Sequence, residues 1–76
     1  MLRFSLSAPG PIRLQVFDVA GRLVRTLAEG SFEAGDHSIP WNGLDDSGNE
    51  LSSGAYFYRL QMSGTIVGTE KTIMLK

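Results

Sequence analysis

The chain has 76 residues, of which 42% are hydrophobic, and its seven basic and eight acidic side chains leave a formal net charge of −1. This length is enough for one domain, and a domain so short buries only about 60% of the surface that its unfolded chain exposes. The charges form no basic stripe of the kind that binds nucleic acid, and no apolar run reaches the ~20 residues that span a bilayer. Cysteine is absent, which excludes disulfides and thiolate chemistry.

The first third of the chain reads as three short strands joined by turns. Residues 1–7 alternate between apolar and polar side chains, which is typical of a half-buried strand. A second strand is predicted over residues 12–18. Asp18 and Gly21 then reverse the chain, because the carboxylate can cap a turn and the glycine can take a left-handed conformation. The return strand, residues 22–28, has conflicting apolar parity, which indicates an edge strand or a bulge.

The middle of the chain is predicted to hold a loop and an edge strand. Residues 29–36 read as a loop around Phe32, and residues 37–41 read as a short strand that Pro40 confines to a sheet edge. His37 is the only histidine. We expect it to be a solvated strand residue, because a zinc site would need further histidine or cysteine ligands.

Residues 41–58 carry the only tryptophan, two turn signals and the start of an aromatic strand. Turn residues of this type supply positive φ or short hydrogen bonds from side chain to backbone, so each signal marks a reversal of the chain. A large aromatic residue on each side of two reversals can close the core of a small β-sandwich. We therefore interpret this segment as the structural centre of the fold, and the residues expected to hold it are Trp41, Gly43, Asp45, Gly48, Gly54, Tyr56 and Tyr58.

The last two predicted strands cover residues 54–63 and residues 65–76, with a tight turn between them. The first of them begins with the spacing of an Ig-type strand F. The Tyr56 hydroxyl should therefore bond back to nearby backbone, and Tyr58 should take the core position. The apolar residues of the last strand change parity near Gly68, which indicates a bulge.

Short strands at this spacing, without helical periodicity, predict an all-β fold. We expect an immunoglobulin-like antiparallel β-sandwich of about seven strands, forming a single domain over residues 1–76. Its expected core consists of Ile12, Leu14, Val16, Trp41, Tyr58, Leu60 and Leu75.

Side chains that could carry chemistry are few. Asn42, Asp45, Asp46, Asn49 and Glu50 could supply oxygen ligands to calcium, but their spacing does not match an EF-hand loop. The alternative is that the aspartates cap turns, with the Asp45 carboxylate accepting several backbone N–H groups. The acidic residues also specify no carboxylate pair for glycoside hydrolysis. We expect no enzymatic activity, no metal and no cofactor.

Phe17, Phe57 and Met74 are placed by strand alternation on the face opposite their core neighbours. Two interpretations of these residues stay open. They can pack beside loops or arginine side chains, as scattered exposed apolar residues commonly do. They can also form a contiguous outer patch that docks on a passenger domain or on a sister subunit.

Two runs resemble a known family. Residues 16–27 read V-F-D-V-A-G-R-L-V-R-T-L, close to the family signature V-Y-D-V-A-G-R-L-V-R-T-L. The second run is the spaced pattern Trp41-x-Gly43-x-Asp45-x-x-Gly48-x-x-Leu51-x-x-Gly54-x-Tyr56-x-Tyr58. The ending, residues 71–76, is similar to the family's K-x-hydrophobic-K close. Together they resemble the Ig-like domain of the flagellar hook-capping protein FlgD, which overlaps the type A C-terminal sorting domain of the type IX secretion route. The sequence departs from the family at Pro40 and in lacking an Asn-Pro-Phe lead-in.

The resemblance implies a non-catalytic C-terminal module of a longer bacterial protein, either secreted or at the cell surface. It would act in sorting, spacing or assembly, with a passenger domain or the secretion machinery as partner. One alternative is self-assembly of sister subunits into an extracellular fibre, because the terminal strands could offer open sheet edges. A second alternative is a carbohydrate- or protein-binding module with Tyr56 or Phe57 as its platform. The exposure of Trp41 would discriminate a wet stacking site from a dry core anchor.

Overall fold

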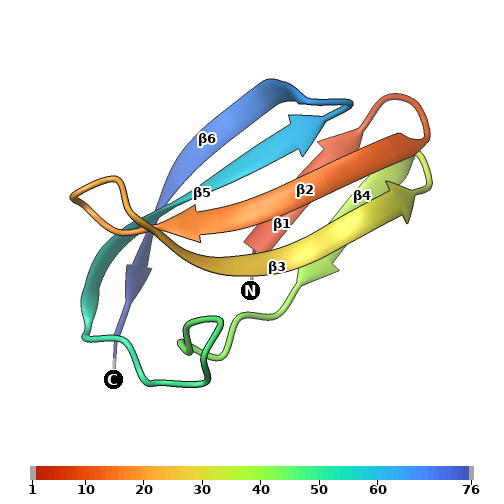
Figure 1. The fold of residues 1–76 in the computed structure, drawn as a ribbon. Coiled ribbons are helices and arrows are strands. Elements are labelled where there is room, and N and C mark those ends of the chain that lie inside the picture. The colour runs from red at the N-terminus through yellow and green to blue at the C-terminus, as the bar shows by residue number, and fades with distance from the viewer. Residues whose placement is uncertain (1, 76) are drawn as a thin grey trace.

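The computed structural model describes residues 2–75 as six β-strands in two antiparallel sheets (Figure 1). The strands are β1 (Leu2–Leu6), β2 (Gly10–Phe17), β3 (Leu23–Phe32), β4 (Gly35–Ile39), β5 (Gly54–Met62) and β6 (Thr65–Met74). The larger sheet has the order β3-β2-β5-β6, and β1 pairs with β4 in a smaller sheet behind it in Figure 1. The all-β, Ig-like prediction is therefore confirmed, with six strands rather than about seven. Among residues 2–75, no helix has the length and apolar character needed to cross a membrane.

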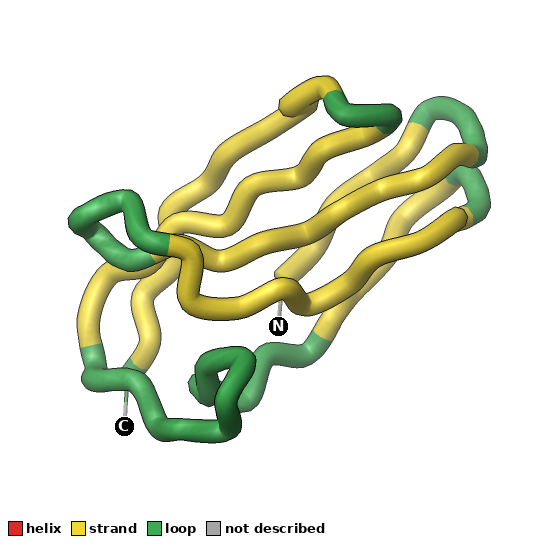
Figure 2. The backbone as a smooth tube through the Cα atoms, viewed as in Figure 1, coloured by secondary structure: helices red, strands yellow, loops and turns green. Residues whose placement is uncertain are grey.

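Residues 40–53 form a long loop instead of contributing a further strand (Figure 2). Only an isolated bridge between Leu44 and Glu50 adds sheet-like pairing within it. Gly43 and Gly48 adopt positive φ values of 79° and 86° in this loop. Backbone of this kind turns the chain and does not extend it, in agreement with the two turns predicted in this segment.

Residues 29–36 do not form the predicted loop. β3 continues through Phe32, which lies opposite Gly10 of β2, so the pairing of the two strands extends to their ends. Gly30 had suggested a turn, yet it sits within β3 with φ of 134°. The predicted first and last strands also included Met1 and Lys76, which lie outside the described residues.

β3 is both an edge strand and a bulged strand, which explains its conflicting parity. It lies at one end of the larger sheet, and its register with β2 shifts twice. Val24 and Leu27 are the extra residues at these shifts, and both pack against the core. Each added residue moves the following side chains to the other face of the strand.

The core lies between the two sheets, and its buried residues come from β1, β2 and β5. Of the seven core residues predicted, four are buried, and Trp41 and Tyr58 are half-buried against them. The prediction for Leu75 is wrong, because its side chain is 84% exposed. The buried residues are Leu2, Leu6, Ile12, Leu14, Val16, Tyr56 and Leu60.

Leu75 is exposed because the register of β6 places the other parity inward. Met74 lies opposite Gly54, and Thr72 lies opposite the buried Tyr56. Cross-strand partners share a face, so Thr72 and Met74 point to the core side. The predicted bulge near Gly68 is confirmed by a register shift between Leu60 and Gln61. Met74 consequently packs against the core and not on the outer face, where strand alternation had placed it.

His37 lies in a strand, as predicted, and its side chain is half-buried instead of fully exposed. Its ring stacks on Phe4 with centroids 5.2 Å apart, and Phe32 meets it edge-on, also at 5.2 Å. The ring Nε2 donates a hydrogen bond to the Glu33 carbonyl, at 2.7 Å. This small aromatic cluster closes the end of the sandwich where β3 turns into β4.

Candidate functional site

The loop of residues 40–53 folds upon itself through backbone hydrogen bonds. The Leu51 amide donates to the Gly43 carbonyl at 3.0 Å, and the Asp45 amide donates to the Asn49 carbonyl at 2.9 Å. These two bonds close the loop into a compact turn. This segment is the one interpreted above as the structural centre of the fold.

The Asp45 carboxylate caps this turn, as predicted. Its Oδ1 accepts the backbone N–H groups of Ser47 and Asn49, each at 2.9 Å. The Gly48 amide in turn donates to the Asp45 carbonyl at 3.0 Å. Asp45 therefore holds the loop through both its side chain and its backbone.

Trp41 serves as an anchor of this loop and not as a wet platform. Its Nε1 donates to the Leu44 carbonyl at 3.2 Å. Its ring meets Tyr56 edge-on, with centroids 5.4 Å apart, and it packs against the core. Because a stacking platform for sugars needs an exposed ring face, this packing argues against Trp41 as a carbohydrate site.

The Tyr56 hydroxyl bonds back to nearby backbone, which confirms the prediction of a corner tyrosine. It donates to the Ser52 carbonyl at 2.6 Å, and the side chain is only 7% exposed. Tyr56 is therefore a core residue, and it does not offer an exposed binding platform.

Removing the Tyr56 hydroxyl should weaken the fold. Tyr56→Phe is expected to lower the free energy of unfolding by about 0.5–1.5 kcal/mol, because the ring stays packed while one hydrogen bond is lost. Urea denaturation measures the change. Tyr58→Phe is the matched control, since that hydroxyl bonds only to the exposed Glu70 carboxylate, at 2.9 Å. Equal midpoints for Tyr56→Phe and the wild type would contradict this role.

The loop is tied to the edge of β3 by contacts that the sequence did not predict. Arg25 Nη1 donates to the carbonyls of Leu44 and Asp45, at 3.3 and 3.2 Å. The Asp46 amide donates to the Val24 carbonyl, and Asp46 Oδ1 accepts the Thr26 amide, both at 3.0 Å. Asp46 thus occupies the edge of β3 as a short added strand would. An arginine among apolar strand residues was the only sequence signal of this contact.

Asp18 and Gly21 form the predicted turn between β2 and β3. Asp18 Oδ1 accepts the backbone N–H groups of Ala20 and Arg22, both at 3.0 Å, and Gly21 has φ of 84°. The hydrogen bond from the Arg22 amide is the main cause that holds the pKa of Asp18 below its ordinary value. The stabilisation from this turn is therefore present above the unfolded-state pKa and is lost as the pH falls through the lowered pKa.

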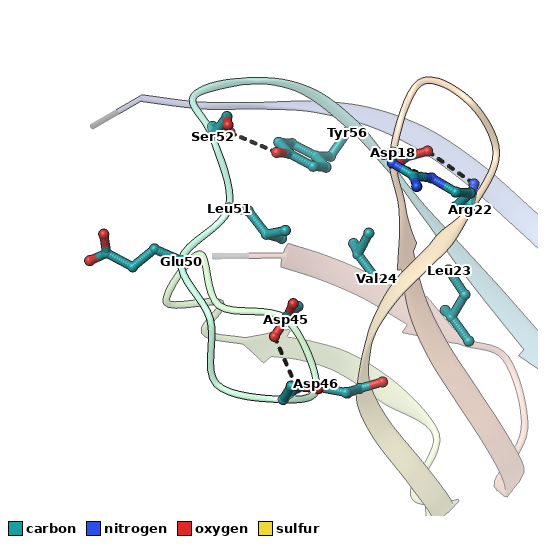
Figure 3. Close-up of a pocket in the computed structure, with 11 residues that line it drawn as sticks. Asp18, Arg22, Leu23, Val24, Asp45, Asp46, Glu50, Leu51, Ser52 and Tyr56 are labelled. Carbon is teal, nitrogen blue, oxygen red and sulfur yellow. Dashed lines mark hydrogen bonds and ion pairs between the residues drawn. The ribbon is translucent and has the colours of Figure 1, made fainter.

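An open cleft of about 540 Å³ separates this turn from the loop (Figure 3). Its wall includes Asp18, Asp45 and Asp46, and all three carboxylates accept backbone N–H groups. Residues 2–75 contain no group of three acidic, histidine or cysteine side chains arranged to hold a metal ion. The three carboxylates on the cleft wall therefore hold the surrounding backbone in place.

Tyr58 points toward β6, where its hydroxyl donates to Glu70. Partial burial, and then the hydrogen bond and charge of Glu70, raise the pKa of Tyr58 above its ordinary value. Because the pKa of Tyr58 is higher in the folded state, the protonated phenol contributes fully to stability at pH values below its unfolded-state pKa. This contribution is lost as the pH rises through the folded-state pKa.

Alkaline titration of Tyr58 should therefore depend on Glu70. Glu70→Gln is expected to lower the pKa of Tyr58, because it removes the negative charge that opposes ionisation. Phenolate absorbance measures the titration, and Tyr58→Phe identifies which step belongs to this residue. A Tyr58 titration that Glu70→Gln leaves unchanged would contradict the assignment.

Phe17 and Phe57 are half-buried cross-strand partners on β2 and β5. The Arg59 guanidinium covers the Phe17 ring, 4.5 Å from its centroid. Leu23, opposite Phe17 on β3, is 47% exposed. We call Leu23, Phe17 and Phe57 the outer patch, because they share the face of the larger sheet that points away from the core.

Six antiparallel strands in two sheets, a corner tyrosine and a capped loop before it define a small Ig-like sandwich domain. Comparison with protein families matches residues 2–66 to the FlgD Ig-like domain. The chain belongs to this family. The match ends before residues 71–76, the run that resembles the close of a sorting domain. A search of curated proteins found no match.

Proposed function

We propose that this domain is a non-catalytic C-terminal sorting, spacer or assembly module of a bacterial secreted or cell-surface protein. The observation that supports a non-catalytic role is that the carboxylates on the cleft wall are engaged in hydrogen bonds with the backbone. Asp18, Asp45 and Asp46 all accept backbone N–H groups, and these bonds hold the turn and the loop in place. The family provides the second support, because an FlgD Ig-like domain is generally a non-catalytic module of an extracytoplasmic protein.

A reporter fusion tests the sorting role. Residues 1–76 are fused downstream of a secreted reporter enzyme, in a bacterium that has a type IX secretion system. The fusion should reach the cell surface or the medium, while the same reporter without the domain should stay in the periplasm. The Leu14→Ala fusion, in which the core is disrupted, should behave like the reporter alone. If the reporter stays in the periplasm with and without the domain, a sorting role is ruled out.

The outer patch is the surface that we propose for contact with a passenger domain. Phe57→Ser should lower the unfolding midpoint more in a passenger fusion than in the isolated domain, because only the fusion can lose a docking contact. Thermal unfolding of both proteins measures the difference. Equal losses in fusion and isolated domain would show that Phe57 only supports the fold.

A further inference from the structure

We propose that β1 accepts one extended strand from another polypeptide, and that this strand lies over the inner face of β5 and β6. The proposal goes beyond the sorting role and does not rest on it. The smaller sheet has two strands and the larger sheet has four, so the smaller sheet leaves part of the inner face uncovered. Among residues 2–75, β1 pairs with β4 alone, and its other edge borders the uncovered part.

A groove of about 230 Å³ lies at this edge. One wall is β1, with Arg3, Phe4 and Ser5, and the floor is formed by Tyr58 and Leu60 of β5 and by Val67, Gly68 and Glu70 of β6. Figure 1 shows that β5 and β6 continue beyond β1 and β4, without a strand of the smaller sheet behind them. The groove is therefore the place where the second layer of the sandwich stops short.

Gly68 leaves space in the floor of this groove. It lies opposite Leu60, so a side chain at this position would point toward the missing layer. A Cβ added to Gly68 would meet no atom within 4 Å, and its backbone is not left-handed. Val67, beside it, is 55% exposed. An apolar side chain of an added strand could fill this space without moving the floor.

The free edge of β1 determines what kind of partner fits. Its unpaired backbone N–H and C=O groups are satisfied together only by another extended chain. A folded second copy that paired antiparallel through its own β1 would place its larger sheet in the layer that β5 and β6 of the first copy already occupy. The partner is therefore a single extended segment and not the sheet of an intact second copy.

The side chains around the groove define the chemistry of that segment. Its inward positions should be apolar, because they cover Leu60 and the space above Gly68. Its outward position beside the exposed Arg3 should carry a carboxylate, since opposite charges on neighbouring strands attract. We expect a segment of about five residues that matches the length of β1, with apolar side chains at alternate positions.

The other sheet edges are less suited to strand addition. Asp46 already bonds to β3 at Val24 and Thr26, which blocks that edge. β6 is interrupted by its bulge and carries Glu70 and Lys71, charges of the kind that discourage edge pairing. β4 also has a free outer edge, but none of its residues lines the groove, whereas Arg3, Phe4 and Ser5 of β1 do.

Peptide binding to the isotope-labelled domain, followed by NMR, tests the proposal. The probe is the blocked peptide acetyl-TVEVTV-amide, and the control is a blocked peptide of the same composition with its three valines adjacent. The alternating peptide should shift the amide signals of β1 and Gly68 together, and the control peptide should bind at least tenfold more weakly. Shifts confined to β4 or β6, or equal binding of both peptides, would overturn the proposal.

Two variants locate the binding site. Gly68→Leu should weaken binding at least tenfold, because it fills the groove, whereas Thr69→Leu places the same side chain on the opposite face and should bind like the wild type. Arg3→Glu, at an exposed position, should instead prefer acetyl-TVKVTV-amide. Wild-type binding by Gly68→Leu, or an unchanged charge preference in Arg3→Glu, would overturn the proposal. If the same amides shift with protein concentration and no peptide, the occupant is a second copy and the proposal is wrong.

Discussion

Leu14→Ala is expected to lower the free energy of unfolding by about 2–5 kcal/mol. Leu14 has no exposed surface and lies in β2, between Ala28 of β3 and Leu60 of β5. Alanine would leave a cavity where the two sheets meet. A core this small rarely supplies more than about 3–5 kcal/mol, so most of the variant should be unfolded at room temperature.

Urea denaturation followed by tryptophan fluorescence measures this loss. Leu14→Met preserves the volume and should cost less than about 1.5 kcal/mol, which keeps one variant of this site folded. Arg13→Ala is the matched surface control on the same strand. It breaks an exposed ion pair with Glu29, at 2.6 Å, and such pairs contribute at most about 1 kcal/mol. If Leu14→Ala were as stable as Arg13→Ala, the core would lie elsewhere.

Asp45→Ala is expected to lower the free energy of unfolding by about 1–2 kcal/mol. The carboxylate accepts two backbone N–H groups within the loop, and alanine would leave both without this acceptor. The effect should spread to β3, because Arg25 binds the Asp45 carbonyl. Loosening of the loop should therefore also expose the edge of β3.

Asp45→Asn separates the hydrogen bonds from the charge. Asparagine keeps a side-chain oxygen that can accept both N–H groups, so this variant should retain most of the stability. Calcium should leave the urea midpoint of the wild type unchanged. An unchanged midpoint for Asp45→Ala would contradict the capping role. A calcium-dependent increase that Asp45→Ala abolishes would instead assign the loop to metal binding.

The sequence predicted the local parts of this structure well. The bonds of Asp18, Asp45 and Tyr56 join residues that are two to four positions apart. Turn chemistry of this range depends on the residue types and their spacing, so it can be recognised without knowing the fold. The strand alternation of β1, β2 and β5 was equally clear.

The sequence could not predict features that depend on strand register. The bulge at Gly68 reverses which residues of β6 face inward, so Leu75 was placed in the core and Met74 outside it. A slip of one residue exchanges the two faces of a strand. The contacts of Arg25 with the loop also join residues about 20 positions apart. The sheet order β3-β2-β5 and the path of the loop before β5 together bring them into contact.

Size-exclusion chromatography with light scattering, over a range of concentrations, tests the central claim that this domain is an appended module. We expect a monomer of 8.3 kDa at every concentration. One sheet edge is blocked by the loop, and the groove beside β1 admits a single strand but not a folded copy. Growth in mass with concentration, or filaments in the void volume, would contradict the account and favour a self-assembling fibre subunit.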